Sequence, residues 1–190
     1  MKVAITGHTS GIGKAFADEC RSRGFEVVGF SRSTGTNIAE LSDQDFILSS
    51  INDCDIFINN AHDRFGQVEL FSKVWQSWKN KSRLIINIGT FVTSTRTGAN
   101  GPQHVMGRAH YAAEKVGLEM AVNWAWCDSD SCCEAIIVRP GLTDTPRVAD
   151  DRPGAPRVDA TSMAKYVMSS VLEQPFVVRE LVITPRKNNA

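Results

Sequence analysis

The sequence lacks the long apolar runs and the excess of one charge that mark membrane proteins and nucleic-acid-binding proteins. No apolar run reaches the roughly 20 residues that span a bilayer. The chain has 21 lysines and arginines against 21 aspartates and glutamates, so its net charge gives no attraction for nucleic acid or an anionic membrane. The N-terminal MKVAITG starts a strand pattern at once and leaves no room for a signal peptide. We therefore expect a cytoplasmic protein that binds neither a membrane nor nucleic acid.

Cysteine and histidine are few and irregularly placed. The five cysteines include the adjacent Cys132 and Cys133, and they show no Cys-x-x-Cys spacing. An odd, scattered set argues against a disulfide framework. The four histidines show no close pairing of the kind that binds metals. We therefore expect neither disulfides nor a metal site.

Short apolar runs alternate with longer stretches of helical character, which predicts an α/β fold in one domain over residues 1–190. We expect strands at 3–5, 27–30, 56–58, 84–88, 135–138 and 181–184. We expect helices at 14–23, 43–51, 68–78, 111–126 and 161–172, with Ser42 and Thr161 as N-caps. Residues 143–158 form a polar, proline-containing stretch of the kind that makes a substrate loop.

Three glycines follow the first expected strand and open the first helix. Gly7, Gly11 and Gly13 lie in the stretch ITGHTSGIGKAF. Glycines here let the backbone approach a pyrophosphate, while the helix N-terminus supplies N–H groups and a positive dipole end. This context predicts a Rossmann-type, doubly wound parallel sheet in three α/β/α layers that binds a dinucleotide.

The end of the second expected strand indicates which dinucleotide is bound. Folds that bind NAD usually place an acid there to hold the adenosine ribose. This chain has Ser31 and Arg32 instead, in VVGFSRS. Arginine can bind a 2′-phosphate that an acid would repel. We therefore expect NADP(H) rather than NAD(H).

Tyr111 and Lys115 lie four residues apart in HYAAEKVGLEM, so one helical face presents both. A free tyrosine has a pKa near 10, and a neighbouring ammonium favours the phenolate. Lowering that pKa by about three units needs roughly 4 kcal/mol of differential stabilisation. The pair therefore predicts an acid–base group tuned for neutral pH.

Together these motifs resemble the short-chain dehydrogenase/reductase family from Val3 to about Pro185. TGHTSGIG is similar to the cofactor loop of the family, NNAH to its Asn-Asn-Ala-Gly segment, INIGT to its fifth strand, and RPGLTDT to the segment that holds the nicotinamide carboxamide. Tyr111 and Lys115 match its catalytic pair. The tail ELVITP resembles the last strand of NADP-dependent members, and Asn37 and Ile38 resemble an adenine-contacting pair after a shortened third strand.

The resemblance implies that NADPH delivers hydride to the carbonyl carbon of an aldehyde or ketone while Tyr111 donates a proton to its oxygen. Lys115 holds the nicotinamide ribose, and a hydroxyl beyond the fifth strand positions the carbonyl. The family pattern also implies a homodimer or homotetramer. The expected cofactor-binding residues are Gly7, Thr9, Ser10, Gly11, Ile12, Gly13, Ser31, Arg32, Asn37, Ile38, Asn60, Ala61, His62, Tyr111, Lys115, Pro140, Gly141, Leu142, Thr143 and Thr145.

The chain also departs from the family pattern near the expected reaction centre. The serine usually found about thirteen residues before the tyrosine is replaced by Gly98. Alignment by the strand instead gives the serine role to Thr90, with Ser94 as the alternative. His62 stands in place of a glycine. The helix-four asparagine has no clear match apart from Gln67.

Glu114 replaces a common serine directly before the catalytic lysine. Such changes leave open a second reading, in which the chain is a catalytically weak dinucleotide-binding sensor or scaffold. An intact Tyr111 argues against that reading, because a pure binder needs the lysine for the ribose and no tyrosine acid. A lyase or epimerase of the wider superfamily would need more than the roughly fifty residues that follow Gly141. We expect the four tryptophans to pack in the core or at an interface.

Overall fold

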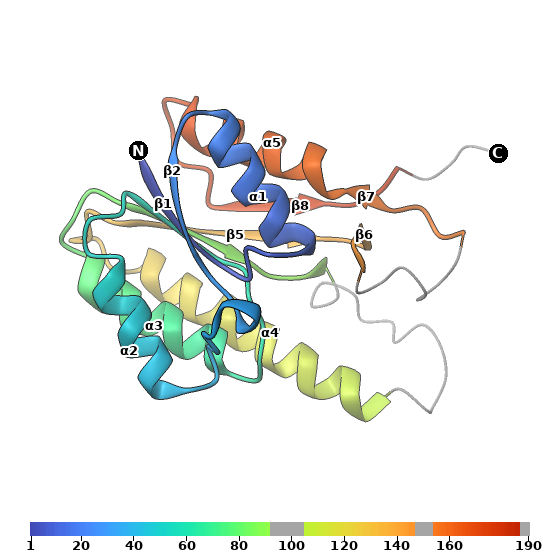
Figure 1. Ribbon diagram of the computed structural model, residues 1–190, viewed down its shortest axis with the longest axis horizontal. Coiled ribbons are helices and arrows are strands. Elements are labelled where there is room, and N and C mark those ends of the chain that lie inside the picture. The colour runs from blue at the N-terminus through green and yellow to red at the C-terminus, as the bar shows by residue number, and fades with distance from the viewer. Residues whose placement is uncertain (92–104, 147–153, 187–190) are drawn as a thin grey trace.

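Six parallel strands form one sheet in the order β2-β1-β3-β4-β5-β8 (Figure 1). The computed structural model describes residues 1–91, 105–146 and 154–186, apart from the side chains of 105–108. The strands are β1 (Lys2–Thr6), β2 (Glu26–Phe30), β3 (Ile56–Asn59), β4 (Leu84–Ile88), β5 (Glu134–Pro140) and β8 (Glu180–Ile183). Each pairs in parallel with its neighbours, for example Ile58 with Ile86. The predicted parallel sheet is confirmed.

Helices cover both faces of this sheet (Figure 1). One face carries α1 (Gly11–Ser22) and α5 (Ala160–Leu172). The other carries α2 (Leu41–Ser50), α3 (Gly66–Trp78) and α4 (Val105–Trp126). The fold is therefore the predicted three-layer, Rossmann-type arrangement.

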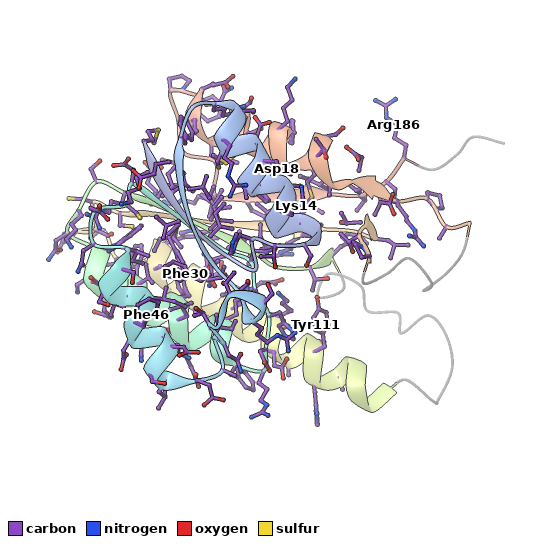
Figure 2. The ribbon with its side chains drawn as sticks, in the orientation of Figure 1. Lys14, Asp18, Phe30, Phe46, Tyr111 and Arg186 are labelled. Carbon is purple, nitrogen blue, oxygen red and sulfur yellow. The ribbon has the colours of Figure 1, made fainter. Side chains whose placement is uncertain are left out.

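Buried strands explain why the apolar runs are unbroken. All residues of β3 and β4 are buried, and successive side chains enter different cores. Ile56 and Ile58 pack with the core beneath α1 and α5, whereas Phe57 packs with the core beneath α2, α3 and α4. At the edge of the sheet, the Phe30 ring lies 6.2 Å from the ring of Phe46 on α2, in an edge-on contact (Figure 2). Aliphatic and aromatic side chains thus shield both faces of the sheet from solvent.

The expected N-caps were wrong. Glu40 precedes α2, where Ser42 was expected, and Asp159 precedes α5, where Thr161 was expected. The Asp159 carboxylate accepts a hydrogen bond of 2.6 Å from the Ser162 backbone N–H. Glu40 makes no side-chain capping hydrogen bond, so the start of α2 is not set by a capping side chain. Asp and Thr are both preferred N-cap residues, so residue type alone does not choose between Asp159 and Thr161. Helix α4 also begins at Val105, six residues before the expected start.

The shortened third strand expected before Asn37 is absent from residues 31–40. The chain forms a 3₁₀ turn there, η1 (Arg32–Thr34), and Gly35 follows in the left-handed region at φ 86°. The Ser31 N–H donates to Thr34 Oγ1 at 3.1 Å, and Thr34 Oγ1 donates to the Ser31 carbonyl at 3.0 Å. Side chains thus satisfy the local backbone in place of a strand partner.

The ends of the expected substrate loop are joined. Two-residue strands β6 (Thr143–Asp144) and β7 (Val158–Asp159) pair in parallel, so residues 143 and 158 lie side by side. The Arg157 guanidinium lies 3.2 Å from the Asp144 carboxylate across this pairing. Residues 147–153 of the loop lie outside the described part of the chain.

Candidate active site

The strand order places the candidate site at the carboxyl edge of the sheet. From β1 the chain passes to β2 on one side, and β3 returns on the other side of β1. Doubly wound sheets bind ligands at this reversal point. The glycine loop follows β1, and the segment from Asn60 to His62 follows β3, so both expected cofactor segments meet here.

The glycine loop is tight because its backbone folds back on itself. Gly7 has φ 72°, and a Cβ on Gly13 would lie 2.2 Å from the Gly7 carbonyl oxygen. No larger residue fits at Gly13 without displacing the loop. Ser10 precedes α1, and its side chain makes no capping hydrogen bond. A Cβ on Gly11 would lie 3.3 Å from Thr145 Cγ2, which places the segment after β5 beside the loop.

Hydrogen bonds from Thr6 join the carboxyl ends of β1 and β3. Thr6 Oγ1 accepts the backbone N–H groups of Asn60 at 2.9 Å and Ala61 at 3.0 Å. The Asn60 amide Nδ2 donates to the Thr6 carbonyl at 2.9 Å. The expected cofactor residues Asn60 and Ala61 are therefore held beside the glycine loop by hydrogen bonds to Thr6.

Hydroxyl groups and one guanidinium gather at the end of β2. Ser33 Oγ donates to Thr9 Oγ1 at 3.0 Å and lies 2.9 Å from Ser31 Oγ. Arg32 has a side chain that is 77% exposed, and its guanidinium lies 3.9 Å from the Asp63 carboxylate. Such a group can turn from its carboxylate toward a phosphate.

Three further features shape this end of the site. The His8 ring covers Gly29, where a Cβ would lie 2.3 Å from the imidazole. Asn37 uses its backbone N–H to bond the Asp43 carboxylate at 2.7 Å. The Ile38 side chain is buried in the core, so a contact of Ile38 with adenine would come from its backbone.

The Lys115 ammonium is buried and held by two oxygen atoms. It donates to Gln67 Oε1 at 2.7 Å and to the Ile88 carbonyl, at the end of β4, at 2.9 Å. Gln67 Nε2 donates to the carbonyls of Asn59 at 2.7 Å and Ile88 at 3.1 Å. The Asn59 side chain in turn donates to the Gln67 carbonyl and to Asn87 Oδ1, both at 3.0 Å. A buried polar network thus fixes Lys115 at the carboxyl ends of β3 and β4.

Tyr111 lies one turn before Lys115 on α4, among the side chains at the carboxyl edge (Figure 2). Lys115 Nζ lies 5.8 Å from the centroid of the phenol ring. The His62 ring meets the phenol edge to face, with centroids 4.9 Å apart and an interplanar angle of 74°. His62 Nε2 also lies 2.8 Å from Glu114 Oε2. The expected Tyr111 and Lys115 are therefore together, with two further titratable groups beside them.

Thr90 lies two residues beyond the end of β4 and is buried. The Gly89 N–H before it donates to the Val138 carbonyl at 2.7 Å, which fixes the turn against β5. Ser94, the alternative for the serine role, lies outside the described residues.

The segment from Pro140 to Thr145 is anchored on the other side of the site. The Gly141 N–H donates to the Ile183 carbonyl of β8 at 2.7 Å, and Thr143 Oγ1 donates to the Gly141 carbonyl at 3.0 Å. The Leu142 carbonyl accepts the Val158 N–H at 2.8 Å. This segment is positioned by β8 and β7, which the sequence does not reveal by spacing.

Solved structures of similar shape are numerous, whereas no family model and no curated protein matches the sequence. A 3-alpha-hydroxysteroid dehydrogenase from a Pseudomonas species, complexed with NADH, has a TM-score of 0.74 at 16% identity and covers 97% of this chain and 95% of its own. A short chain dehydrogenase from Burkholderia cenocepacia, in complex with NADP, has a TM-score of 0.78 at 19% identity and covers 95% and 86%. An alcohol dehydrogenase from the archaeon Thermococcus sibiricus, complexed with 5-hydroxy-NADP, has a TM-score of 0.70 at 17% identity and covers 100% and 97%. This chain has the short-chain dehydrogenase/reductase fold.

Within this fold, two features of the site escaped sequence reasoning. One is the network of Asn59, Asn87 and Gln67 around the lysine, although Gln67 alone was named as a substitute for the helix-four asparagine. The other is the contact of His62 with Glu114, which are 52 residues apart. Buried asparagines at the ends of two apolar strands were a signal for the first. No sequence signal marked the second.

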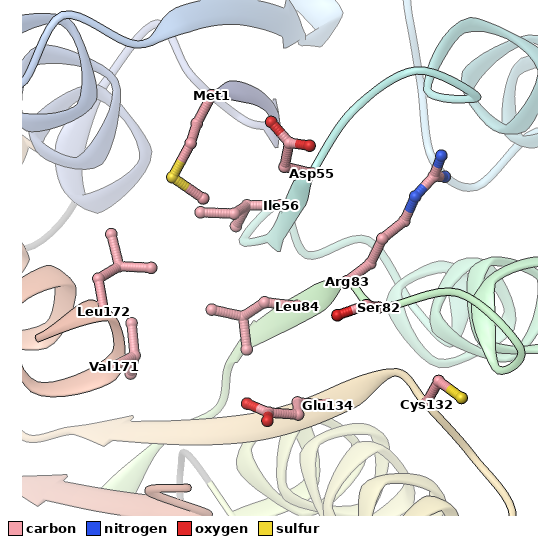
Figure 3. A pocket seen from close by; sticks show the side chains of 10 residues that line it. All are labelled: Met1, Asp55, Ile56, Ser82, Arg83, Leu84, Cys132, Glu134, Val171 and Leu172. Atoms are coloured by element: carbon pink, nitrogen blue, oxygen red, sulfur yellow. The ribbon is translucent and has the colours of Figure 1, made fainter. Parts of the chain in front are cut away.

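The remaining polar groups suggest no other reaction centre in the described part of the chain. Burial raises the pKa of the Cys20 and Cys54 thiols to about 11 and that of Cys133 to about 12, so these cysteines stay protonated and unreactive. Among the described residues no group of three metal-ligating side chains exists, and no helix is long and apolar enough to cross a membrane. A hollow of about 380 Å³ lies at the opposite, amino edge of the sheet, lined by residues such as Met1, Asp55, Arg83 and Glu134 (Figure 3).

Proposed function

We propose that this chain is a member of the short-chain dehydrogenase/reductase family that reduces an aldehyde or ketone with NADPH, or oxidises the alcohol in reverse. The observation that carries the proposal is the placement of Tyr111 and Lys115. Lys115 bonds the Ile88 carbonyl at the carboxyl end of β4, and Tyr111 packs on His62 beyond β3. An acid–base pair and a dinucleotide loop thus lie at the same edge of the sheet.

Tyr111, Lys115 and Thr90 each have a separate role in the proposed reaction. Bound NADPH would supply the hydride that adds to the carbonyl carbon. Tyr111 gives its proton to the carbonyl oxygen, and the Lys115 ammonium favours the phenolate that remains. Lys115 also binds the nicotinamide ribose, and the Thr90 hydroxyl orients the carbonyl oxygen.

The dinucleotide is held along the same edge. Gly7, Gly11 and Gly13 admit the pyrophosphate at the N-terminus of α1, where Thr9, Ser10 and Ile12 complete the loop. Asn37 and Ile38 would hold the adenosine end, and Asn60, Ala61 and His62 would hold the middle of the dinucleotide. The segment from Pro140 to Thr145, including Gly141, Leu142 and Thr143, would hold the nicotinamide end; within it Thr143 Oγ1 donates to the Gly141 carbonyl. Residues 143–158 would then form the substrate loop, because Thr145 lies beside Gly11.

Tyr111→Phe tests the reaction. We expect it to abolish NADPH oxidation with a panel of aldehydes, ketones and quinones while NADPH binding stays nearly intact. Tyr166→Phe is the matched control, because Tyr166 is the only other tyrosine and is exposed on α5. Loss of binding together with turnover would refute the assigned role. Wild-type protein that binds NADPH but turns over no carbonyl would favour the sensor or scaffold instead.

Arg32→Asp tests the choice of cofactor. Arg32 would exchange Asp63 for the 2′-phosphate, with Ser31 beside it. We expect the ratio of dissociation constants for NADPH and NADH to shift by about tenfold or more toward NADH, since a charged hydrogen bond contributes about 1.5–3 kcal/mol. Arg21→Asp, an exposed change on α1, is the control. An unchanged ratio would refute the phosphate contact.

A homodimer, or a homotetramer that contains it, fits the surface of α4. Val116, Met120 and Trp124 are exposed and follow one another at four-residue intervals, so they form an apolar stripe on one helix face. The other tryptophans are more buried, and the Trp126 indole donates to the Ala135 carbonyl at 2.7 Å. Sedimentation of the wild-type chain, compared with Trp124→Glu, measures whether this stripe is an interface.

A further inference from the structure

Two departures from the family pattern meet beside the candidate catalytic tyrosine. His62 stands where the family has glycine, and Glu114 stands where it often has serine. The structure brings His62 Nε2 to 2.8 Å from Glu114 Oε2. Both side chains are 15% exposed, so the pair is largely enclosed. Glu114 takes no part in the proposed reaction, and His62 takes part only as a member of the segment that would bind the cofactor.

The pair limits where the phenol ring of Tyr111 can lie. Glu114 and Tyr111 lie three residues apart on α4, and His62 reaches across from the segment after β3. Its hydrogen bond to Glu114 fixes the imidazole, whose ring meets the phenol at 74° with centroids 4.9 Å apart. This is a favourable aromatic geometry. Lys115 Nζ also lies near the ring, 5.8 Å from the phenol centroid.

We propose that His62 and Glu114 are positioning residues for Tyr111: Glu114 fixes the imidazole, the imidazole fixes the phenol, and the charge of the pair acts on the ionisation of the phenol. This inference rests on the proposed function, because it assigns the pair to the tyrosine that donates the proton. A proton donor must be held in place for efficient transfer, and small displacements reduce rates strongly.

A charged residue directly follows each member of this pair in the chain. Lys115 follows Glu114 on α4, and Asp63 follows His62 in the segment after β3. Asp63 is in turn 3.9 Å from Arg32, beyond the end of β2. Glu114 is the negative charge that lies within one helical turn of Tyr111 and touches its packing partner. Removing that charge should therefore make the phenol easier to ionise.

A direct titration tests the electrostatic half of the proposal without cofactor or substrate. The chain has two tyrosines, so in a Tyr166→Phe background the ultraviolet difference absorbance of the phenolate reports Tyr111 alone. We expect Glu114→Gln to lower the midpoint of that titration by about 0.5 to 1 pH unit, which is the shift that one charge produces on a group within one helical turn. His110→Gln is the control, because His110 is exposed and adjacent to Tyr111. An unchanged midpoint in Glu114→Gln overturns the proposal.

Kinetics test the positioning half. We expect His62→Ala to lower kcat about tenfold or more. KM for NADPH should stay within about twofold, because a position that is glycine in the family would contact the cofactor through its backbone. His62→Gln, which can still bond Glu114, should recover part of the rate. The double variant with Glu114→Ala should be hardly slower than either single variant, because the two act as a unit. His110→Ala should stay at the wild-type rate. A rise in KM for NADPH and in the NADPH dissociation constant that matches the fall in kcat would show that the His62 side chain itself contacts the cofactor, and it would overturn the positioning role.

The two proposals fail in distinguishable ways. If Tyr111→Phe retains full activity, the proposed function fails, whatever the titration shows. If Tyr111→Phe is inactive while Glu114→Gln leaves the titration midpoint unchanged, the proposed function stands and the His62–Glu114 assignment is wrong.

Discussion

Replacing Gln67 by leucine removes the side-chain oxygen that holds the buried Lys115 ammonium. Leucine fills a similar volume, so the change acts mainly on hydrogen bonds. Gln67 Oε1 accepts from Lys115 Nζ at 2.7 Å, and Gln67 Nε2 donates to the carbonyls of Asn59 and Ile88. A hydrogen bond to a charged group contributes about 1.5–3 kcal/mol, and the two neutral bonds contribute about 1 kcal/mol each at most.

We therefore expect Gln67→Leu to lower the free energy of unfolding by about 3 kcal/mol. For a domain of this size, that corresponds to a fall of about 6–12 °C in Tm, measured by calorimetry or circular dichroism. Gln76→Leu, an exposed change on the same helix, should leave Tm nearly unchanged.

A thermodynamic cycle isolates the contribution of the lysine. In a Lys115→Met background there is no ammonium to leave unpaired, so only the two neutral bonds are lost, and Gln67→Leu should lower the free energy of unfolding by only about 1–2 kcal/mol. An equal loss of stability in both backgrounds would show that Gln67 does not hold Lys115, and it would refute the reasoning.

Two further predictions concern Thr90 and the cap of α5. Thr90→Ala should reduce kcat more than Ser94→Ala does, and Thr90→Ser should retain most of the rate; the opposite order would move the serine role to Ser94. Asp159→Ala should lower the free energy of unfolding by about 1 kcal/mol at pH 7. The bond to the Ser162 N–H lowers the pKa of Asp159 in the folded chain, so this stability is complete above its ordinary pKa near 3.9 and is lost as the pH falls below it. In chemical denaturation, an equal difference between wild type and variant at pH 7 and pH 3 would contradict the carboxylate cap.

The strands and the motif spacing carried most of the prediction of the fold. Unbroken apolar runs such as IFI at 56–58 predict strands, because parallel strands are buried on both faces. The incorrect predictions concern helix starts and one expected strand. Helix α2 begins after Glu40 without a side-chain cap, and Asp159 caps α5 two residues before the expected Thr161. The turn η1 replaces a strand through side-chain hydrogen bonds of Ser31 and Thr34.

The candidate site was predictable to the extent that neighbours in sequence are neighbours in space. Tyr111 and Lys115 share a helix face, so their spacing reports their contact. The partners of this pair come from elsewhere: Gln67 lies 48 residues before Lys115, and His62 lies 52 residues before Glu114. Such contacts depend on how α3 and α4 pack on the sheet, and no pattern within one segment encodes that packing.

These long-range contacts also change how the departures from the family pattern are to be interpreted. Taken singly, the loss of a glycine, a serine and a helix asparagine suggests a weakened site and favours a sensor or scaffold. In the structure the first two replacements, His62 and Glu114, bond each other against Tyr111, and Gln67 bonds Lys115 directly. Replacements that together hold both Tyr111 and Lys115 in place are expected where these two residues are still used in a reaction. A protein that only binds a dinucleotide needs Lys115 for the ribose but gains nothing from a held, ionisable Tyr111, and this contrast is what the phenolate titration and the Tyr111→Phe kinetics measure together.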